Sequence, residues 1–187
     1  MSDSYDVVIV GGGLVGLSAA LLLDAAVSQQ LRIAIVEARP PALLSSDSLP
    51  DMSLRVSALS PASVCILESL GVWSSVVAQR VSPYSGMYVW HSSTSGSFDH
   101  ALEFSAAELS VRELGFIVEN DLLRKALWEQ ALAAPAIDIV PPASPESLSI
   151  SEDGAELVLS DASVVSARLL VAADGANSDL RELLNVQ

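Results

Sequence analysis

The N-terminal sequence reads Tyr5-Asp6-Val7-Val8-Ile9-Val10, then Gly11-Gly12-Gly13-Leu14-Val15-Gly16, then Leu17-Ser18-Ala19-Ala20-Leu21-Leu22-Leu23. The first run is apolar and rich in β-branched residues, which is typical of a parallel strand buried on both faces. The last run is rich in Ala and Leu, as in a helix that packs on such a strand. Because glycines lie between the two runs, the sequence predicts a strand, a tight turn and a helix.

Three of the glycines fit the pattern G-x-G-x-x-G: Gly11, Gly13 and Gly16. In this pattern the first glycine permits the tight turn, the second lets the backbone approach a pyrophosphate, and the third lets helix and strand pack closely. Amides at the helix N-terminus then face the phosphates with the positive end of the helix dipole. The motif alone is weak evidence, because glycine-rich turns also occur in βα units that bind nothing.

An acidic residue at the expected distance strengthens the motif. A second apolar run, residues 31–36, ends at Glu37, which lies 24 positions after Gly13. Dinucleotide-binding folds place an acid about 20 residues after the glycines, where its carboxylate accepts hydrogen bonds from a ribose. The alternative is a solvated glutamate at a strand end. We expect dinucleotide binding, and the acid favours a free 2′-hydroxyl, hence FAD or NAD rather than NADP.

Composition excludes several classes of protein. The chain has 187 residues, of which 51% are hydrophobic, enough for one domain or a little more with a real core. Its net charge of −14 argues against binding to nucleic acid, which needs clustered Lys and Arg. The charge also opposes electrostatic docking on anionic lipid, although contact through a local apolar patch stays open. The single cysteine, Cys65, is expected to be a small buried residue in a reducing compartment.

The middle of the chain departs from the βαβ rhythm. Residues 60–71 predict a short helix, with Ser60 as N-cap, Pro61 at the first helical position and Gly71 as the stop. Residues 86–90 and 101–104 read as two strands joined by a turn at 92–97. We interpret this pair as the beginning of a second sheet and expect its aromatic residues to lie in the core of that sheet: Tyr88, Trp90 and Phe104.

The C-terminal part returns to the first sheet. Residues 121–132 predict a helix whose apolar positions lie on one face, and residues 137–140 predict a further parallel strand. Three short runs then read as a β-meander: 147–151, 155–159 and 163–166. A separate buried strand, 167–173, leads into Asp174-Gly175 at the carboxyl edge of the sheet, where open α/β sheets hold ligands. Although an Asp-Gly pair is often only a turn, we favour a site contact here.

Taken together, these motifs resemble those of the FAD-dependent aromatic hydroxylases, or class A flavin monooxygenases. The resemblance rests on Gly11–Gly16 with Glu37-Ala38-Arg39, and on Asp174-Gly175-Ala176-Asn177-Ser178-Asp179-Leu180-Arg181, which fits the D-G-x-x-S-x-x-R motif of the family. Residues 54–59 with 70–73, 86–90 and 114–120 are similar to motifs of the ubiquinone-biosynthesis branch, above all its bacterial polyprenylphenol hydroxylases. The resemblance covers essentially the whole chain but only the N-terminal half of a typical member. We therefore expect an N-terminal fragment.

The resemblance implies an α/β fold of the Rossmann-like FAD/NAD(P)-binding type. It would consist of a parallel sheet, helices and a three-stranded β-meander, with part of a second β-sheet substrate domain. Residues 1–80 and 106–187 would form an incomplete FAD-binding domain, and residues 81–105 would begin the substrate-domain sheet.

The resemblance also assigns cofactor contacts. The residues of the glycine turn would surround the FAD pyrophosphate: Gly11, Gly13, Leu14, Val15 and Gly16. Glu37 would hold the adenosine ribose, and Asp174 with Gly175 would sit beside the pyrophosphate. Arg39 and Arg55 would lie along the adenosine and pyrophosphate with Asn120 nearby, although both arginines also have a plain interpretation as solvated loop cations.

By the same resemblance, the parent protein would use FAD, NAD(P)H and O2 to hydroxylate the ring of a polyprenylated phenol in ubiquinone biosynthesis. Since the flavin carries the chemistry, we assign no catalytic side chain and no metal ligand. Partners would be the phenol, O2 and other ubiquinone-biosynthesis proteins, with no nucleic acid. We expect a cytoplasmic location, with peripheral contact at the inner membrane left open.

Two other functions are considered. The chain as given could be a non-catalytic nucleotide-binding or docking module of that pathway, since the fragment itself is expected to be inactive. An NAD-dependent dehydrogenase is less compatible with the meander and the Asp174-Gly175 motif. We expect weak or absent FAD retention, because the ribityl and isoalloxazine ends lose contacts, and each 1.4 kcal/mol lost is about tenfold in affinity.

Overall fold

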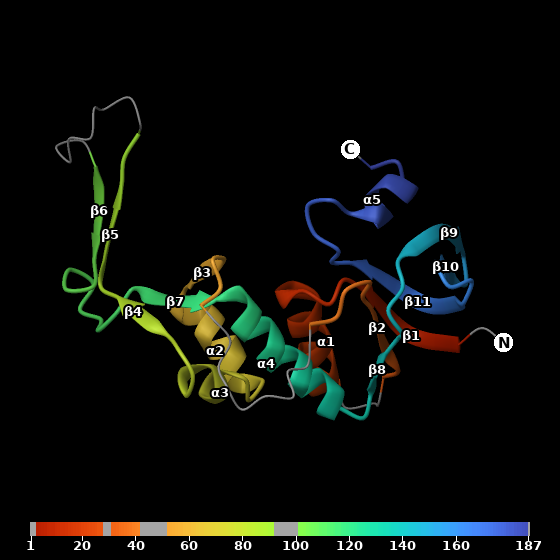
Figure 1. The fold of residues 1–187 in the computed structure, drawn as a ribbon, viewed down its shortest axis with the longest axis horizontal. Coiled ribbons are helices and arrows are strands. Elements are labelled where there is room, and N and C mark those ends of the chain that lie inside the picture. The colour runs from red at the N-terminus through yellow and green to blue at the C-terminus, as the bar shows by residue number, and fades with distance from the viewer. Residues whose placement is uncertain (1–2, 28–30, 42–51, 92–100, 187) are drawn as a thin grey trace. The chain divides into compact units, whose positions relative to one another are not determined.

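The computed structural model describes residues 3–27, 31–41, 52–91 and 101–186 (Figure 1). Contacts between residues divide the chain into two compact units. Unit 1 comprises residues 1–47 and 123–187, and unit 2 comprises residues 48–122. Each unit is described by itself.

Unit 1 is built on a six-stranded sheet of order β8-β2-β1-β11-β10-β9. Its elements, in chain order, are β1 (Asp3–Val10), α1 (Leu14–Ala26), β2 (Ile33–Val36), α4 (Asn120–Ala133, of which the first three residues belong to unit 2), β8 (Ile137–Ile139), β9 (Pro145–Ser151), β10 (Gly154–Leu159), β11 (Val164–Ala172) and α5 (Asp179–Leu183). Strands β8, β2, β1 and β11 run parallel to one another, and β11, β10 and β9 are antiparallel. This arrangement confirms the expected α/β fold with its parallel strands and meander.

Strand β11 joins the two parts of this sheet. Its residue Val165 pairs with Leu157 of β10 in antiparallel fashion, while Leu169 pairs with Val7 of β1 in parallel fashion. The prediction of two separate strands, 163–166 and 167–173, is therefore wrong, because no turn residue interrupts the run and one long strand serves both neighbours. The strand is also less buried than predicted, since Leu169 is half exposed.

The core of unit 1 follows the apolar pattern of its strands. Ile9, Ile33 and Ile35 are completely buried in adjacent strands. Helix α1 packs on β1 and β2 and buries Leu17 and neighbouring small residues. Burial of these side chains supplies the main favourable free energy for ordering the β1–α1–β2 unit. The predicted strand, turn, helix and strand are confirmed.

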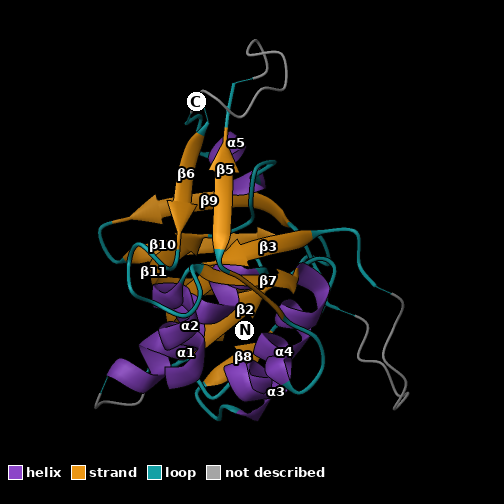
Figure 2. Ribbon diagram, turned by 90° about the vertical axis from the view of Figure 1, so that its left-hand side faces the viewer, coloured by secondary structure: helices purple, strands orange, loops and turns teal. Residues whose placement is uncertain are grey.

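Unit 2 contains a three-stranded antiparallel sheet and a separate hairpin. Its elements are β3 (Val56–Leu59), α2 (Pro61–Ser69), α3 (Trp73–Val77), β4 (Ser82–Tyr84), β5 (Gly86–Val89), β6 (Leu102–Ser105) and β7 (Gly115–Glu119). The sheet has the order β3-β7-β4, and β5 pairs with β6. Figures 1 and 2 show the β5–β6 hairpin standing out from β7, and Figure 1 also labels β4 at its base.

Helix α2 begins where the sequence predicts. The hydroxyl of Ser60 accepts a hydrogen bond from the Ser63 amide at 3.3 Å, and Pro61 is the first helical residue. The helix buries Val64 and Leu67. Cys65 lies outside that stripe and is exposed, so the expectation of a buried cysteine is wrong.

The β5–β6 hairpin also corrects an expectation. Tyr88, Trp90 and Phe104 are exposed by 48%, 49% and 44%, so they do not lie in a core. Among the described residues this sheet has only two strands, which leaves both of its faces open. The predicted turn at 92–97 lies outside the described residues. The assignment of 81–105 to a substrate-domain sheet stays a prediction, and the division by contacts falls instead at residues 48 and 122.

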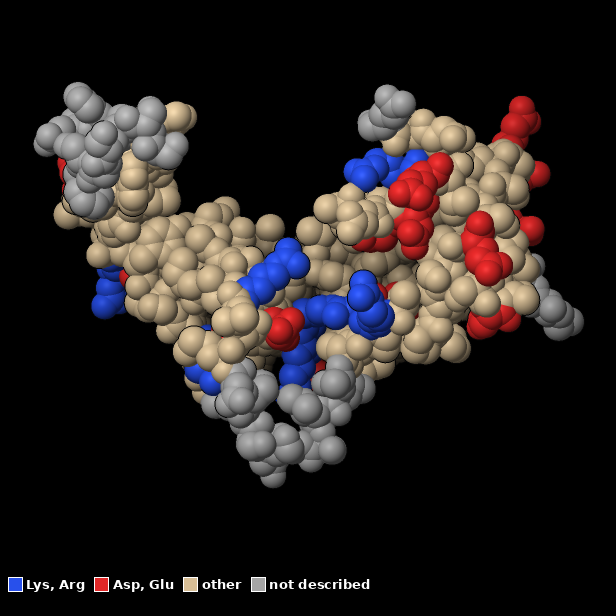
Figure 3. All heavy atoms as spheres, turned by 45° about the horizontal axis from the view of Figure 1, so that its top comes forward, with Lys and Arg blue, Asp and Glu red and all other residues tan. Residues whose placement is uncertain are grey.

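The charges of unit 1 are unevenly distributed. On the face that Figure 3 shows, Asp and Glu side chains gather over the part of unit 1 that holds β9–β11 and α5. An anionic ligand is therefore disfavoured on that surface. In the described ranges, no helix combines the length and the apolar character needed to cross a membrane.

Candidate dinucleotide-binding site

The glycine turn lies at the carboxyl end of β1 and opens helix α1. Gly13 is the N-cap residue of α1, and its carbonyl accepts the first helical hydrogen bond from Leu17 at 3.0 Å. The Gly11 amide donates to the Val36 carbonyl at 2.8 Å, which fixes the turn to the end of β2. The amides of the first helical turn lack intrahelical acceptors, so the turn provides hydrogen-bond donors for an anion.

The glycines of the motif differ in what surrounds them. Gly11 has φ +111°, and a Cβ there would meet the carbonyl oxygen of Ala173. A Cβ at Gly16 would meet the carbonyl oxygen of Gly11. By contrast, a Cβ at Gly13 would meet nothing within 4 Å. The protein itself therefore requires the first and third glycines, whereas the space at the middle one is open to a ligand.

Glu37 is held against this turn. Its Oε2 accepts a hydrogen bond from the Gly12 amide at 2.7 Å, and its Oε1 accepts one from the Arg39 amide at 2.8 Å. Because its side chain is only 16% exposed, it is not simply a solvated strand-end glutamate. A carboxylate offers about four lone-pair positions, so one remains for a hydroxyl donor after these two bonds and an arginine partner.

That partner is Arg124, which sequence reasoning missed. Its Nε donates to the Gly12 carbonyl and its Nη2 to the Arg39 carbonyl, each at 2.8 Å, and Nη2 lies 3.2 Å from Oε2 of Glu37. The guanidinium also lies 5.9 Å from the centre of the Trp128 ring. One planar side chain thus ties helix α4 to the glycine turn and to the end of β2. The only signal in the sequence was a cation near the N-terminal end of a helix, where the helix dipole disfavours it.

The Asp174 motif forms a loop bonded to itself directly after β11. Asp174 accepts hydrogen bonds from the Ser178 hydroxyl at 2.7 Å and the Leu180 amide at 3.2 Å. Ser178 in turn caps α5 by accepting from the Arg181 amide, and Arg181 donates to the Ala176 carbonyl at 2.7 Å. Both oxygens of Asp174 therefore shape the loop.

The loop places one glycine of the motif in open space at the glycine turn. Gly175 has φ +88°, and a Cβ there would meet no atom within 4 Å. The Ala173 amide donates to the Val10 carbonyl at 2.7 Å, so the loop starts beside the glycine turn. The structure thus brings together the predicted residues of unit 1: Gly11, Gly13, Leu14, Val15, Gly16, Glu37, Arg39, Asp174 and Gly175. Val15 is 74% exposed and Arg39 is exposed as well.

The other two predicted residues lie in unit 2, where the backbone joins them. The Asn120 amide donates to the Arg55 carbonyl at 3.0 Å. The Oδ1 atom of Asn120 accepts a hydrogen bond from the Ser57 hydroxyl at 2.7 Å. Arg55 itself is exposed.

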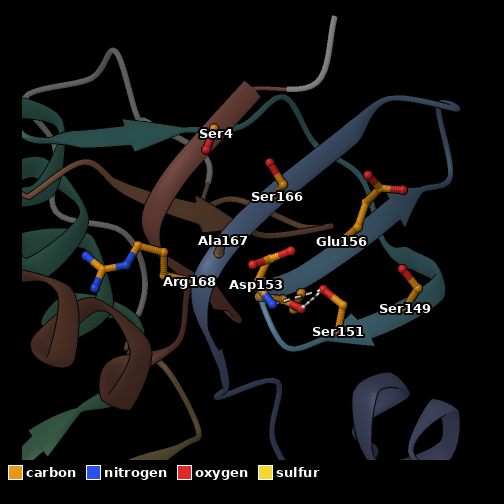
Figure 4. A pocket seen from close by; sticks show the side chains of 10 residues that line it. Ser4, Ser149, Ser151, Asp153, Glu156, Ser166, Ala167 and Arg168 are labelled. Carbon is orange, nitrogen blue, oxygen red and sulfur yellow. Dashed lines mark hydrogen bonds between the residues drawn. The ribbon is translucent and has the colours of Figure 1, made fainter.

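Two surface hollows of unit 1 contain none of these residues. One, of about 350 Å³, is lined by serines and acids of β1, β9, β10 and β11 (Figure 4). In Figure 4, Arg168 points away from Ser149 and Glu156, and it pairs with Asp6 at 3.4 Å. The acidic side chains of this hollow do not suit a phosphate, whereas the glycine turn offers amide donors.

Comparisons with known proteins agree with this geometry. Residues 4–187 match a family model described as an FAD binding domain. The chain is 39% identical over 181 residues to 3-demethoxyubiquinol 3-hydroxylase of Escherichia coli, covering 97% of this chain and 44% of that protein. It is 33% identical to the mitochondrial ubiquinone biosynthesis monooxygenase COQ6 of Caenorhabditis elegans, covering 99% of this chain and 41% of that protein. The chain thus spans less than half the length of these relatives.

Solved structures share the fold. PqsL of Pseudomonas aeruginosa, a probable FAD-dependent monooxygenase, matches with a TM-score of 0.71 at 22% identity over 99% of this chain and 46% of that chain. The p-nitrophenol 4-monooxygenase PnpA of Pseudomonas putida matches with a TM-score of 0.71 at 21% identity, covering 98% and 44%. At these identities the likeness establishes the fold alone.

The two kinds of glycine predict losses of stability that differ in size. Gly16→Ala should lower the free energy of unfolding by about 2 kcal/mol or more, because its Cβ would overlap backbone. Gly13→Ala should lower it by about 1 kcal/mol or less, since only an N-cap preference is lost. Urea unfolding followed by circular dichroism measures both, and an equal loss in the two variants would contradict the assignment.

Proposed function

Because the chain belongs to the FAD-binding domain family, we propose that it supplies the FAD-binding portion of a flavin-dependent monooxygenase. The parent enzyme would hydroxylate the ring of a polyprenylated phenol in ubiquinone biosynthesis, with NAD(P)H as electron donor and O2 as oxidant. The similarity to the Escherichia coli and Caenorhabditis elegans hydroxylases supports the choice of pathway. When bound, FAD supplies the redox chemistry, and the protein supplies binding and orientation.

The observation that carries the proposal is the open space at Gly13 beside a fixed Glu37. The amides that open α1 would bind the pyrophosphate, and Glu37 would accept a hydrogen bond from the adenosine ribose. Gly175 offers a second open approach from the loop that follows the neighbouring strand β11. Leu14, Val15 and Gly16 would present their backbone amides to the same phosphates.

Local electrostatics support an anionic ligand in spite of the net charge of −14. The first turn of α1 has no acidic side chain, so nothing there repels a phosphate. The charge of Glu37, which accepts a hydrogen bond from the Gly12 amide of the turn, is compensated by Arg124 at 3.2 Å. The positive end of the helix dipole therefore acts largely unopposed.

Further contacts belong to the proposal as well. Arg39, Arg55, Asn120 and Asp174 would contribute to the binding of FAD, Asp174 through the loop that it shapes. Residues 1–80 and 106–187 would form the FAD-binding domain, and residues 81–105 would begin the substrate-domain sheet. The partners would be the phenol, O2 and other ubiquinone-biosynthesis proteins. The location would be the cytoplasm, with peripheral contact at the inner membrane left open.

A second candidate function follows from the span of the match. Since the chain covers 44% of its Escherichia coli relative, the 187 residues alone would act as a nucleotide-binding or docking module without turnover. The two functions differ in one measurement. Only an enzyme consumes NAD(P)H and O2 when a phenol is present.

A titration with FAD, followed by flavin fluorescence, tests the site. We expect weak but saturable binding by the 187-residue chain and none by Gly13→Asp, whose carboxylate would occupy the phosphate position and repel it. Gly86→Asp is the matched control: its surroundings are also open, with one backbone atom 3.9 Å from the added Cβ. This control should bind FAD as the wild type does.

Circular dichroism shows whether each variant is folded. Equal binding by wild type and a folded Gly13→Asp variant would contradict the pyrophosphate assignment. No binding by a folded wild type would contradict the proposal that these residues suffice for recognition.

The neighbouring cations Arg124 and Lys125 allow a test of whether the position of Arg124 matters for FAD binding. Arg124→Met should weaken FAD binding by about tenfold, because Glu37 and the turn lose a charge-assisted partner worth roughly 1.5–3 kcal/mol. Lys125→Met removes the adjacent charge, which pairs only loosely with the exposed Glu129 at 3.7 Å, and should leave affinity unchanged. An equal loss in both variants would show that net charge, rather than the position of Arg124, sets the affinity.

A further inference from the structure

Among the described residues, Glu119 is the one charged residue that is buried, with 7% of its surface exposed. It ends strand β7, and its Oε1 lies 2.7 Å from Nε of Arg80 while its Oε2 lies 3.2 Å from Nη2. Oε2 also accepts a hydrogen bond from the Ser53 amide at 2.7 Å. A buried ion pair is weak evidence for stability, because apolar residues often serve as well. Its presence here therefore calls for another reason.

The residues after Glu119 bind the same segment. Asp121 accepts a hydrogen bond from the Ser53 hydroxyl at 2.8 Å. The Asn120 amide donates to the Arg55 carbonyl at 3.0 Å, and the Ser57 hydroxyl donates to Oδ1 of Asn120 at 2.7 Å. Three consecutive residues thus hold the segment 53–57, which continues the pairing of β3 with β7 beyond Val56.

This segment has little packing of its own. Met52 is 70% exposed and Leu54 is fully exposed, and Arg55 is exposed as well. Since apolar burial does not fix the segment, its backbone position depends on hydrogen bonds to residues 119–121. The ion pair with Arg80 in turn fixes the carboxylate that receives the Ser53 amide.

The same contacts orient the Asn120 side chain. The Ser57 hydroxyl donates to the side-chain oxygen of Asn120, which leaves the two N–H donors of that amide for other acceptors. Donors are what phosphate and ribose oxygens require. The contacts between residues 53–57 and 119–121 therefore present two groups for an anionic dinucleotide: the exposed Arg55 cation and the Asn120 amide.

We propose that Glu119, held by Arg80, is a positioning residue that places Arg55 and Asn120 for contact with the cofactor. The inference rests on the proposed function, because that function assigns these two residues to FAD. It adds that Glu119 and Arg80, which would not touch the cofactor, influence the affinity for FAD through the segment 53–57.

Glu119→Gln tests the inference in the 187-residue chain, with Asp138→Asn as the matched control. Asp138 pairs with Arg32 at 3.7 Å, and both side chains are more than half exposed. We expect Glu119→Gln to speed hydrogen exchange of residues 53–57 and to raise the Kd for FAD about tenfold, the loss of one charge-assisted partner. Asp138→Asn should change neither. A purely structural pair would instead change thermal stability and the exchange of residues 53–57 but leave the Kd for FAD as it is in the control.

A combined variant shows the route of the effect. In an Arg55→Ala/Asn120→Ala background, Glu119→Gln should weaken FAD binding no further, because the groups that it positions are gone. If Glu119→Gln raises the Kd for FAD in this background by the same factor as in the wild type, the inference is overturned. Unchanged hydrogen exchange of residues 53–57 in Glu119→Gln would overturn it as well. Arg80→Lys keeps the positive charge but loses the two-pronged hydrogen bonding of the guanidinium to Glu119. It should therefore speed exchange and raise the Kd for FAD less than Glu119→Gln does.

The inference and the proposed function fail in different ways. If Arg55→Ala/Asn120→Ala binds FAD like the wild type, the inference is overturned, while loss of binding in Gly13→Asp still supports the proposed function. If the wild type binds no FAD, the proposed function fails, and the inference fails with it.

Discussion

The carboxylate of Glu37 connects the parts of unit 1 on which the proposed cofactor binding depends. It accepts hydrogen bonds from the amides of Gly12 and Arg39 and forms an ion pair with Arg124. These contacts fix the glycine turn, the end of β2 and helix α4 relative to one another. Such a carboxylate is useful only if its charge is compensated, because an uncompensated anion would repel a pyrophosphate at the adjacent helix N-terminus. Arg124 provides that compensation and also holds the turn through the Gly12 carbonyl.

The glycines near the turn fall into two groups, according to whether protein atoms or open space surround them. Gly11 and Gly16 face backbone oxygens of the protein itself, which leaves no room for a side chain. Gly13 and Gly175 lie in the turns that follow the neighbouring strands β1 and β11, and both face open space. The glycines therefore include positions that the fold requires and positions where the surrounding space is open to the proposed ligand. This distinction appears from the surroundings of each residue and not from the spacing of the motif.

Local patterns predicted much of this structure. The apolar run 5–10, the glycines after it and the caps of α2 depend on neighbouring residues, so their elements could be read from the sequence. The spacing to Glu37 was equally informative because a βαβ unit has a nearly fixed length. Arg124 and Glu119 could not be predicted, since their partners lie up to 112 positions away. The exposure of Cys65 and of the β5–β6 aromatic residues depends on what covers each surface, which no local pattern records.

Under the proposed function, unit 1 binds the adenosine diphosphate half of FAD. Calorimetric titration of the 187-residue chain with ADP and, separately, with FMN measures this preference. We expect ADP to bind and to compete with FAD, because the helix amides would bind the pyrophosphate and Glu37 the ribose, and we expect FMN to bind more weakly by at least about tenfold. Tighter binding of FMN than of ADP would show that unit 1 does not bind the adenosine diphosphate half.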